Sequence, residues 1–311
     1  MTCVKWVQTE PISGTKDDAS TRHHIVSGGA DGTVRVWLID LNSNEDAEVR
    51  SILKQIAMLE VHSAPITSVT VGYAASDSLM LVTTAGDFEA TIWTRDNNKN
   101  ISMGQDSWLM SQRMNFGTKI PQCSAIGVTP DGSCTLIALG FADNNVRIFS
   151  KSASINHEYN LSCTLSGHQN WVRSVDFVNI GTSRMLLASG GQDKHIRLWS
   201  IELEEDEGHN THDHTALNKL RVTKYAPKPR MILGGRSYVA ILESLLVGHE
   251  DWVMSVAWNM RKASADTMQD LVLLSSSMDR TMILWRKDAG SGEDFLQTQH
   301  CIVRSTLFFI K

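Results

Sequence analysis

One short pattern recurs along the chain, an aspartate followed six residues later by an aromatic side chain. Its five copies are Asp31/Trp37, Asp87/Trp93, Asp143/Phe149, Asp193/Trp199 and Asp279/Trp285. Successive aspartates are 56, 56, 50 and 86 residues apart, so the unit keeps its internal spacing while the connecting segments vary in length. A fixed unit with variable connections is typical of a repeat protein, in which each unit packs against its neighbours.

Each copy has the pattern of two strands joined by a tight turn. In the first copy, residues 24–29 predict a buried strand, Asp31 and Gly32 a hairpin turn, and residues 33–37 the alternating partner strand. With the strands that flank them, the copies predict four-stranded antiparallel sheets, and one such sheet cannot bury both faces alone. Radial stacking solves this problem, so we predict an all-β fold, a β-propeller with about five blades.

A polar network is expected to brace each blade. The turn aspartate can accept hydrogen bonds from its own hairpin and from an upstream histidine, whose other ring nitrogen can reach a strand hydroxyl and through it the tryptophan. The predicted sets are His62, Thr83, Asp87 and Trp93; His168, Ser189, Asp193 and Trp199; His249, Ser275, Asp279 and Trp285; and, without a histidine, Ser27, Asp31 and Trp37.

The same residues could suggest a Ser-His-Asp hydrolase. We prefer the structural interpretation, because the set is repeated and no nucleophile elbow accompanies it. The chain also has no P-loop, dinucleotide-binding glycine pattern, HExxH motif or paired cysteine ligands. The sequence therefore predicts no catalytic residues, no cofactor and no enzymatic activity.

The repeats predict one incomplete propeller domain over residues 1–290, with repeats ending near Trp37, Trp93, Phe149, Trp199 and Trp285. The chain is expected to begin inside a repeat, and the third copy is the weakest because it lacks a Gly-His pair. Residues 201–243 are expected to form a long insertion, acidic at first and basic later. Residues 291–311 are expected to hold an outer strand and a tail that matches no repeat.

Residues after each Gly-His pair are expected on one rim of the propeller. They are Asn170, Trp171 and Arg173 in one repeat, and Asp251, Trp252 and Met254 in the next. Tryptophan and arginine are frequent anchors of protein interfaces, so these six are the candidate partner-binding residues. The simpler alternative is that Trp171 and Trp252 pack between adjacent blades.

The insertion carries two further patterns. His209, His212 and His214 could hold a transition metal, but without cysteine partners a solvated loop is the simpler interpretation, and we predict no metal site. The basic stretch from Lys219 to Arg236 could make a weak or indirect contact with tRNA phosphates. Pairing with the acidic half of the same insertion is the simpler account.

Charge and cysteine usage limit the class of protein. The formal net charge of −5 argues against a general nucleic-acid binder. Five widely spaced cysteines without a CxxC pair favour a reducing compartment. No signal peptide or membrane-spanning run is apparent, so we expect a protein of the cytoplasm and nucleus with no membrane partner.

The Gly167-His168 and Gly248-His249 openings and the IRLW and MILW endings resemble the WD-repeat family. The resemblance implies a seven-bladed β-propeller that serves as an interaction platform. Within that family, the segments GHEDWV and SSSMDRTMILWR resemble the WD-repeat subunits of Elongator complexes. The narrower resemblance implies a truncated N-terminal propeller, a non-catalytic scaffold bound to other subunits, and a complex that modifies wobble uridines of tRNA and is linked to transcription elongation. The alternative is an adaptor of another complex, such as a ubiquitin-ligase substrate receptor or a chromatin-complex subunit.

Overall fold

The computed structural model describes residues 3–8, 22–41, 51–95, 108–152, 158–204, 229–259, 271–287 and 295–302. Every regular element in these ranges is a β-strand, which confirms the all-β prediction for this part of the chain. Within the same ranges there is accordingly no helix of the length and hydropathy that a membrane crossing needs. The histidine cluster His209, His212 and His214 lies outside the described residues.

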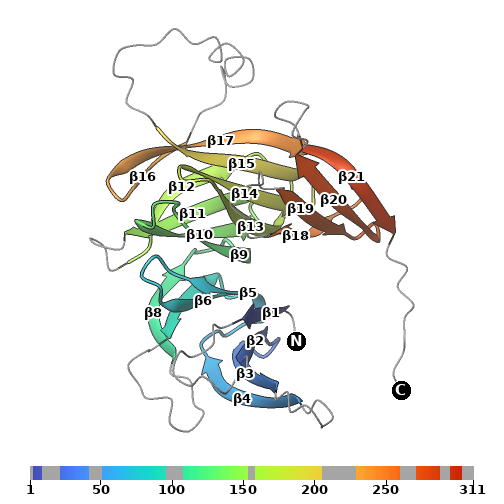
Figure 1. Ribbon diagram of the computed structural model, residues 1–311. Coiled ribbons are helices and arrows are strands. Elements are labelled where there is room, and N and C mark those ends of the chain that lie inside the picture. Colours follow the sequence, from blue (N-terminus) through green and yellow to red (C-terminus); the bar gives the residue numbers. More distant parts are fainter. Residues whose placement is uncertain are drawn as a thin grey trace, which may run out of the picture. The chain divides into compact units, whose positions relative to one another are not determined.

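The strands form five antiparallel sheets (Figure 1). The first sheet contains β1 (Cys3–Gln8), β2 (Arg22–Gly28), β3 (Thr33–Leu41) and β4 (Ser51–Glu60). The second contains β5 (Ile66–Tyr73), β6 (Leu79–Ala85), β7 (Glu89–Arg95) and β8 (Trp108–Asn115). The third contains β9 (Pro121–Val128), β10 (Cys134–Phe141), β11 (Asn145–Ser152) and β12 (Asn160–Ser166). In each of these sheets, consecutive strands are neighbours.

The last two sheets carry the candidate rim. The fourth contains β13 (Val172–Ile180), β14 (Arg184–Gly191), β15 (Ile196–Leu203), β16 (Arg230–Leu233) and β17 (Arg236–Leu246), in the order β13-β14-β15-β17-β16. The fifth contains β18 (Val253–Asn259), β19 (Val272–Ser277), β20 (Thr281–Lys287) and β21 (Phe295–Ile302).

The insertion differs from its predicted extent of 201–243. Strand β15 continues to Leu203, and β16 and β17 form a hairpin that adds a fifth strand to the fourth sheet. The inward side chains of this hairpin are apolar, with Met231, Leu233 and Tyr238 at most 2% exposed. Burial of these side chains stabilises strand structure in a segment whose basic composition suggested a loop. The remainder of the insertion, residues 205–228, is outside the described part of the chain.

The chain divides into two compact units, the first comprising Met1–Ile126 and Phe141–Asp143 and the second Gly127–Gly140 and Asn144–Lys311. The first unit holds the first and second sheets, and the second unit holds the fourth and fifth sheets and most of the third. One hydrophobic core joins the first and second sheets, and another joins the fourth and fifth. In the second unit, Leu198 of the fourth sheet and Leu273 and Ile283 of the fifth have no exposed surface. The boundaries of one domain over residues 1–290, and the seven-bladed ring, stay predictions.

The five hairpin turns share one backbone feature. The residue after each turn aspartate has a positive φ: 78° at Gly32, 68° at Phe88, 70° at Asn144, 70° at Lys194 and 67° at Arg280. Only the first of these is glycine, the residue that adopts a positive φ without steric cost. The constant turn places each aspartate side chain at the same end of its sheet.

Candidate partner-binding rim

The fourth sheet brings together all four residues of its predicted brace. The Nδ1 atom of His168 is 3.0 Å from the Asp193 carboxylate, and its Nε2 atom is 2.8 Å from Ser189 Oγ. Trp199 Nε1 donates to the same oxygen at 3.0 Å. Because the ionised carboxylate can only accept, the proton of the imidazole lies on Nδ1, and Ser189 donates to Nε2. The result is a continuous chain of donors and acceptors.

Burial and charge fix the protonation states in this brace. Burial lowers the pKa of His168, so the imidazole is neutral near pH 7. Burial alone would raise the pKa of the Asp193 carboxyl. Hydrogen bonds from His168 and the Gln169 backbone N–H, with the nearby charge of Arg197, instead hold that pKa well below its ordinary range. Arg197 Nη1 lies 2.8 Å from the same carboxylate.

The fifth sheet repeats the brace. His249 Nδ1 is 3.0 Å from Asp279, and its Nε2 atom is 2.7 Å from Ser275 Oγ. Trp285 Nε1 donates to Ser275 Oγ at 2.8 Å. The fifth sheet therefore has the same chain of hydrogen bonds from the turn aspartate to the tryptophan as the fourth.

The second sheet lacks the last link. His62 contacts Asp87 at 3.0 Å and Thr83 at 2.9 Å, and burial lowers the pKa of His62 as it does that of His168. However, the indole N–H of Trp93 is buried and makes no hydrogen bond. This difference could not be predicted from the sequence, because threonine supplies a hydroxyl as serine does and the spacing is unchanged.

In the first sheet, no histidine belongs to the set. Trp37 Nε1 donates to Ser27 Oγ at 2.9 Å. Asp31 accepts from Thr33 and Arg35, and its side chain is half exposed. A turn aspartate can therefore order its own hairpin without a histidine, but it remains in contact with solvent.

The depth of the braces has a chemical consequence. Ser189 is fully buried, Ser275 is 1% exposed and Thr83 is fully buried. A serine nucleophile must reach a substrate carbonyl, and these hydroxyls are enclosed by their own sheets. The arrangement supports a structural role for the Ser-His-Asp sets.

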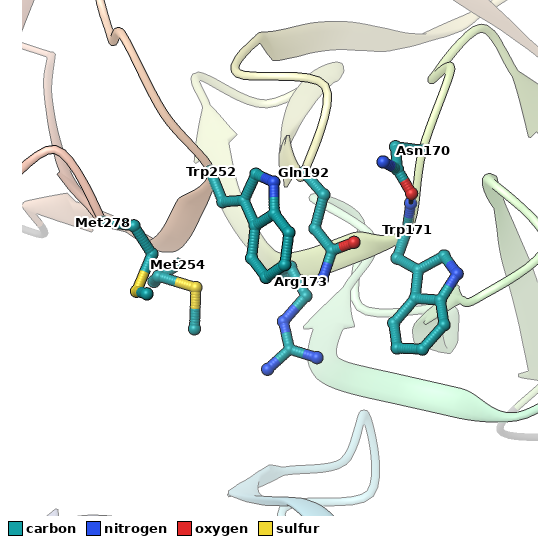
Figure 2. Close-up of a pocket in the computed structure, with 7 residues that line it drawn as sticks. All are labelled: Asn170, Trp171, Arg173, Gln192, Trp252, Met254 and Met278. Carbon is teal, nitrogen blue, oxygen red and sulfur yellow. Dashed lines mark hydrogen bonds between the residues drawn. The ribbon is translucent and has the colours of Figure 1, made fainter.

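The rim residues gather around a hollow of about 500 Å³ in the second unit. Asn170, Trp171, Arg173, Trp252 and Met254, all predicted from the sequence, line it, as Figure 2 shows. Gln192 and Met278 also line it and were missed; both directly precede a turn aspartate, and this shared position was the available signal. Asp251, the sixth predicted residue, lies beside Trp252 but does not line the hollow.

Matching hydrogen bonds fix the backbone of the two tryptophans. Asn170 Oδ1 accepts from the N–H of Trp171 at 2.8 Å, and Asp251 Oδ1 accepts from the N–H of Trp252 at 2.8 Å. The tryptophan carbonyls in turn accept from the N–H groups of Gln192 and Met278. Trp171 and Trp252 nevertheless remain 41% and 42% exposed, which argues against the alternative that they only pack between blades.

Two basic residues of the insertion lie in the described ranges, and both are ion-paired. Arg230 contacts Glu204 at 2.7 Å, and Arg236 contacts Asp131 at 3.5 Å. The first pair joins the basic and acidic ends of the insertion, as the simpler account predicts. The other basic residues, from Lys219 to Lys228, are outside the described part of the chain.

The sequence of the chain matches one known family of repeats. The family described as "WD domain, G-beta repeat" matches residues 2–37, 159–200 and 241–286. These three segments of the chain are WD repeats. The matched WD repeats include the two complete braces and both rim tryptophans.

Curated relatives are similar to this chain over about half to nine-tenths of its length. Elongator complex protein 2 of Homo sapiens is 28% identical over 303 residues, which cover 93% of this chain and 32% of the relative. Elongator complex protein 2 of Dictyostelium discoideum is 26% identical over 304 residues, which cover 88% and 33%. That of Schizosaccharomyces pombe is 34% identical over 152 residues, 49% of this chain and 18% of the relative. The chain thus spans about a third of the length of the first two relatives.

Among solved structures, the WD-repeat fold is similar to a chain in a humanised mutant of the Chaetomium thermophilum Polycomb Repressive Complex 2 bound to an inhibitor. The TM-score is 0.55 and the sequence identity 16%, with coverage of 94% of this chain and 50% of that one. This likeness concerns the fold alone.

Proposed function

We propose that the chain is a non-catalytic WD-repeat scaffold of an Elongator-like complex. The observation that carries the proposal is the similarity to Elongator complex protein 2 from distant eukaryotes over about nine-tenths of the chain. Buried braces and an exposed rim fit this role, because the first stabilise a platform and the second offers it a binding surface. On this proposal the partners are the other subunits of the complex.

The rim hollow is the proposed contact surface. Large, rigid aromatic side chains lose little conformational entropy on binding and bury much area, which is why they dominate many interfaces. Trp171 and Trp252 have these properties, since their backbones are hydrogen-bonded and their indoles are exposed. Binding should therefore depend on both indoles.

The experiment is affinity capture of the tagged chain from its own cells, with quantitative identification of what binds. The wild-type chain should retain the large subunits of an Elongator-like complex. The double variant Trp171→Ala/Trp252→Ala should lose most of them. The matched control is Leu109→Ala/Met110→Ala, which removes two side chains on β8 that are each 53% exposed.

Three results would oppose the proposal. They are recovery of no such subunit, equal recovery by the rim variant, and equal loss in the control. Recovery of ubiquitin-ligase or chromatin subunits instead would favour the alternative adaptor class. Melting curves of all variants establish that the folded state is retained.

The proposed process is modification of wobble uridines in tRNA, with a linked part in transcription elongation, in the cytoplasm and nucleus. Loss of the chain from cells should lower wobble-uridine modification, and restoring the rim double variant should not recover it. Direct tRNA contact is not proposed for Arg230 or Arg236, because carboxylates already pair with both. Unchanged modification in the deletion strain would contradict the proposed process.

A further inference from the structure

A second hollow, of about 520 Å³, lies on the first sheet. Its lining comes from β2, β3 and the turn between them, and consists of residues 27–31, Arg35 and Trp37 (Figure 1). The stretch that contains them, SGGADGTVRVW, matches SGGQDKHIRLW of the fourth sheet at the serine, both glycines, the aspartate, the arginine and the tryptophan. In the fourth sheet, the serine, aspartate and arginine of this pattern all contact His168.

We propose that this first-sheet hollow binds a Gly-His segment of a partner protein, whose imidazole completes the brace of the first sheet. The imidazole would donate to Asp31 through Nδ1 and accept from Ser27 through Nε2. The inference goes beyond the scaffold proposal, because it concerns another surface and does not depend on which complex the chain joins.

The source of the histidine follows from the sequence and the other sheets. Residues 1–22 contain no histidine. The brace histidines His62, His168 and His249 are each bound to a hydroxyl of their own sheet. A partner protein is therefore the proposed source.

The serine of the hollow is held as it is in a complete brace. Ser27 Oγ accepts from the indole N–H of Trp37 at 2.9 Å. The corresponding bond from Trp199 to Ser189 is 3.0 Å long, and the histidine of that sheet lies 2.8 Å from the same hydroxyl. A hydroxyl that accepts from an indole still has its one proton to donate, so Ser27 can supply the bond to Nε2 of an imidazole.

The aspartate is oriented in the same way. Asp31 Oδ1 accepts from the backbone N–H and the hydroxyl of Thr33, at 3.1 and 2.8 Å. Asp279 of the fifth sheet makes the same two bonds to Thr281 through Oδ1, and its Oδ2 accepts from His249 at 3.0 Å. The turn of the first sheet thus directs Oδ2 of Asp31 toward the position of a histidine.

Arg35 does not block this position. Its Nη2 atom donates to Asp31 Oδ2 at 2.9 Å. In the fourth sheet, Asp193 Oδ2 is 2.8 Å from the equivalent arginine, 3.0 Å from the histidine and 3.0 Å from the backbone nitrogen that follows the histidine. One carboxylate oxygen therefore accommodates an arginine, an imidazole and a backbone N–H together.

The exposure of the two sets differs in the direction that the proposal requires. The side chain of Asp31 is 51% exposed, against 3% for Asp193. That of Arg35 is 31% exposed, against 9% for Arg197. The residue types are the same, and the fourth set differs in having His168 bound to it. A partner that covers Asp31 would exclude water from a charge-assisted hydrogen bond and strengthen that bond.

The residue before the histidine must be small. A Cβ atom on Gly167 would lie 3.1 Å from Nε of Arg197 and 3.5 Å from Trp199. Arg35 and Trp37 stand at these positions in the first sheet, so the same restriction applies to the ligand. The hollow should therefore select Gly-His over a histidine that follows a branched residue.

Ions fit the hollow less well than an imidazole. Arg35 opposes a metal cation beside Asp31, and the carboxylate opposes a phosphate beside Arg35. Hydrogen bonds from Thr33 and Arg35 hold the pKa of the Asp31 carboxyl well below its ordinary range, so the carboxylate can only accept. A neutral imidazole donates at one nitrogen and accepts at the other, which matches a carboxylate and a hydroxyl.

The test measures fluorescence anisotropy of labelled peptides with the full chain at pH 8, where a free histidine side chain is neutral. The probe Ser-Gly-His-Gln-Asn has the sequence of residues 166–170. Three comparison peptides replace its histidine by Nδ1-methylhistidine, its histidine by lysine, or its glycine by valine. The methylated ring has no proton on Nδ1 to donate to Asp31. Wild-type protein should bind the probe about tenfold more tightly than each comparison peptide, which corresponds to about 1.4 kcal/mol.

Variants locate the binding site. Asp31→Asn should weaken binding of the probe about tenfold, and Ser27→Ala should weaken it less, because the serine bond is between neutral groups. The matched control is Asp77→Asn, which removes a carboxylate from an exposed residue of the same unit outside the hollow and should change no affinity. The probe should also slow hydrogen exchange in peptides from β2 and β3. Melting curves establish that each variant is folded.

Four outcomes would overturn the inference. The first is equal wild-type affinity for the probe and the Nδ1-methylhistidine peptide, and the second is a preference that survives Asp31→Asn. The third is equally tight binding of the lysine peptide, which would reduce the site to charge attraction. The fourth is self-association of the chain that Asp31→Asn abolishes, measured by analytical ultracentrifugation, which would identify a second copy of the chain as the occupant instead of a partner.

Discussion

Replacement of a brace tryptophan by phenylalanine should remove a hydrogen bond in the fourth sheet, at Trp199, and remove an unsatisfied buried donor in the second sheet, at Trp93. Trp199 donates to Ser189 at 3.0 Å, whereas the indole N–H of Trp93 is buried without a hydrogen bond. The two side chains are equally buried, at 5% and 7% exposed, so the lost volume and apolar area are nearly the same. The difference between the variants therefore reports the hydrogen bond.

The magnitude follows from the two local environments. Trp199→Phe loses one buried neutral hydrogen bond, which contributes about 1 kcal/mol. Trp93→Phe removes a buried donor that has no acceptor, which relieves a cost of about 1 to 3 kcal/mol. Trp199→Phe should thus be more destabilising by about 2 to 4 kcal/mol, at least about 30-fold in the local unfolding equilibrium.

Native-state hydrogen exchange by mass spectrometry is the suitable assay, because the two tryptophans belong to different compact units. Peptides from β6 and β7 report on Trp93, and peptides from β14 and β15 report on Trp199. Trp285→Phe is a second test, since Trp285 donates to Ser275 at 2.8 Å and should behave like Trp199. Equal destabilisation by Trp93→Phe and Trp199→Phe would refute the reasoning.

Three other perturbations test the braces and the packing of the sheets. The pKa of His168 is lower in the folded chain than its ordinary value near 6.5, so the unfolded chain binds more protons and stability should fall as pH falls below about 6.5. The slope per buried histidine is at most about 1.4 kcal/mol per pH unit, and melting temperatures that stay constant from neutral to mildly acidic pH would contradict it. Asp193→Ala should lower the free energy of unfolding by about 1.5 to 3 kcal/mol in urea, because it removes the charged acceptor of a buried imidazole. Asp31→Ala, at a half-exposed site, should change that free energy little, and similar losses in the two variants would contradict the prediction. Gly190→Ala places a methyl group 2.7 Å from a valine of the fifth sheet and should lower the free energy of unfolding by about 1 to 3 kcal/mol, measured by thermal melting. The Cβ atom of Gly86→Ala would meet its nearest atom at 3.5 Å, so this variant should be tolerated. Equal melting temperatures for the two variants would count against this packing.

The strands around each turn could be predicted because their residues act locally. Asp31 and Gly32 select a hairpin turn, and the alternating residues on either side determine which faces are buried. The same reasoning gave the strands β6, β10 and β14, whose residues lie in continuous buried runs. These features depend on neighbours within a few positions.

Other features depend on contacts that spacing does not encode. The hairpin of β16 and β17 sits in a basic segment, and Met231 and Leu233 identify it as a strand only once a surface is present to bury them. The buried N–H of Trp93 makes no hydrogen bond, although the residues of this set have the same spacing as those of the fourth sheet. The exposure of Trp171 depends on the loop after Gly167-His168, where no regular periodicity applies. Sequence therefore predicted the rim positions but not Gln192, Met278 or the hollow they share.

The β16–β17 hairpin also determines how the long insertion is attached. The chain leaves the fourth sheet at Glu204, whose N–H donates to Ser237, and returns at Pro229, whose carbonyl accepts from Ala240. Both anchors flank the single strand β17, and the Arg230–Glu204 ion pair spans the distance between them. Hydrogen bonds to β17 thus hold the two ends of the insertion in place. The entropic cost of closing a longer connection between these ends rises only slowly with its length. We therefore expect this position to be an insertion site that accepts an added domain, an affinity tag or a fluorophore without disturbing the rim or the braces of the fourth and fifth sheets.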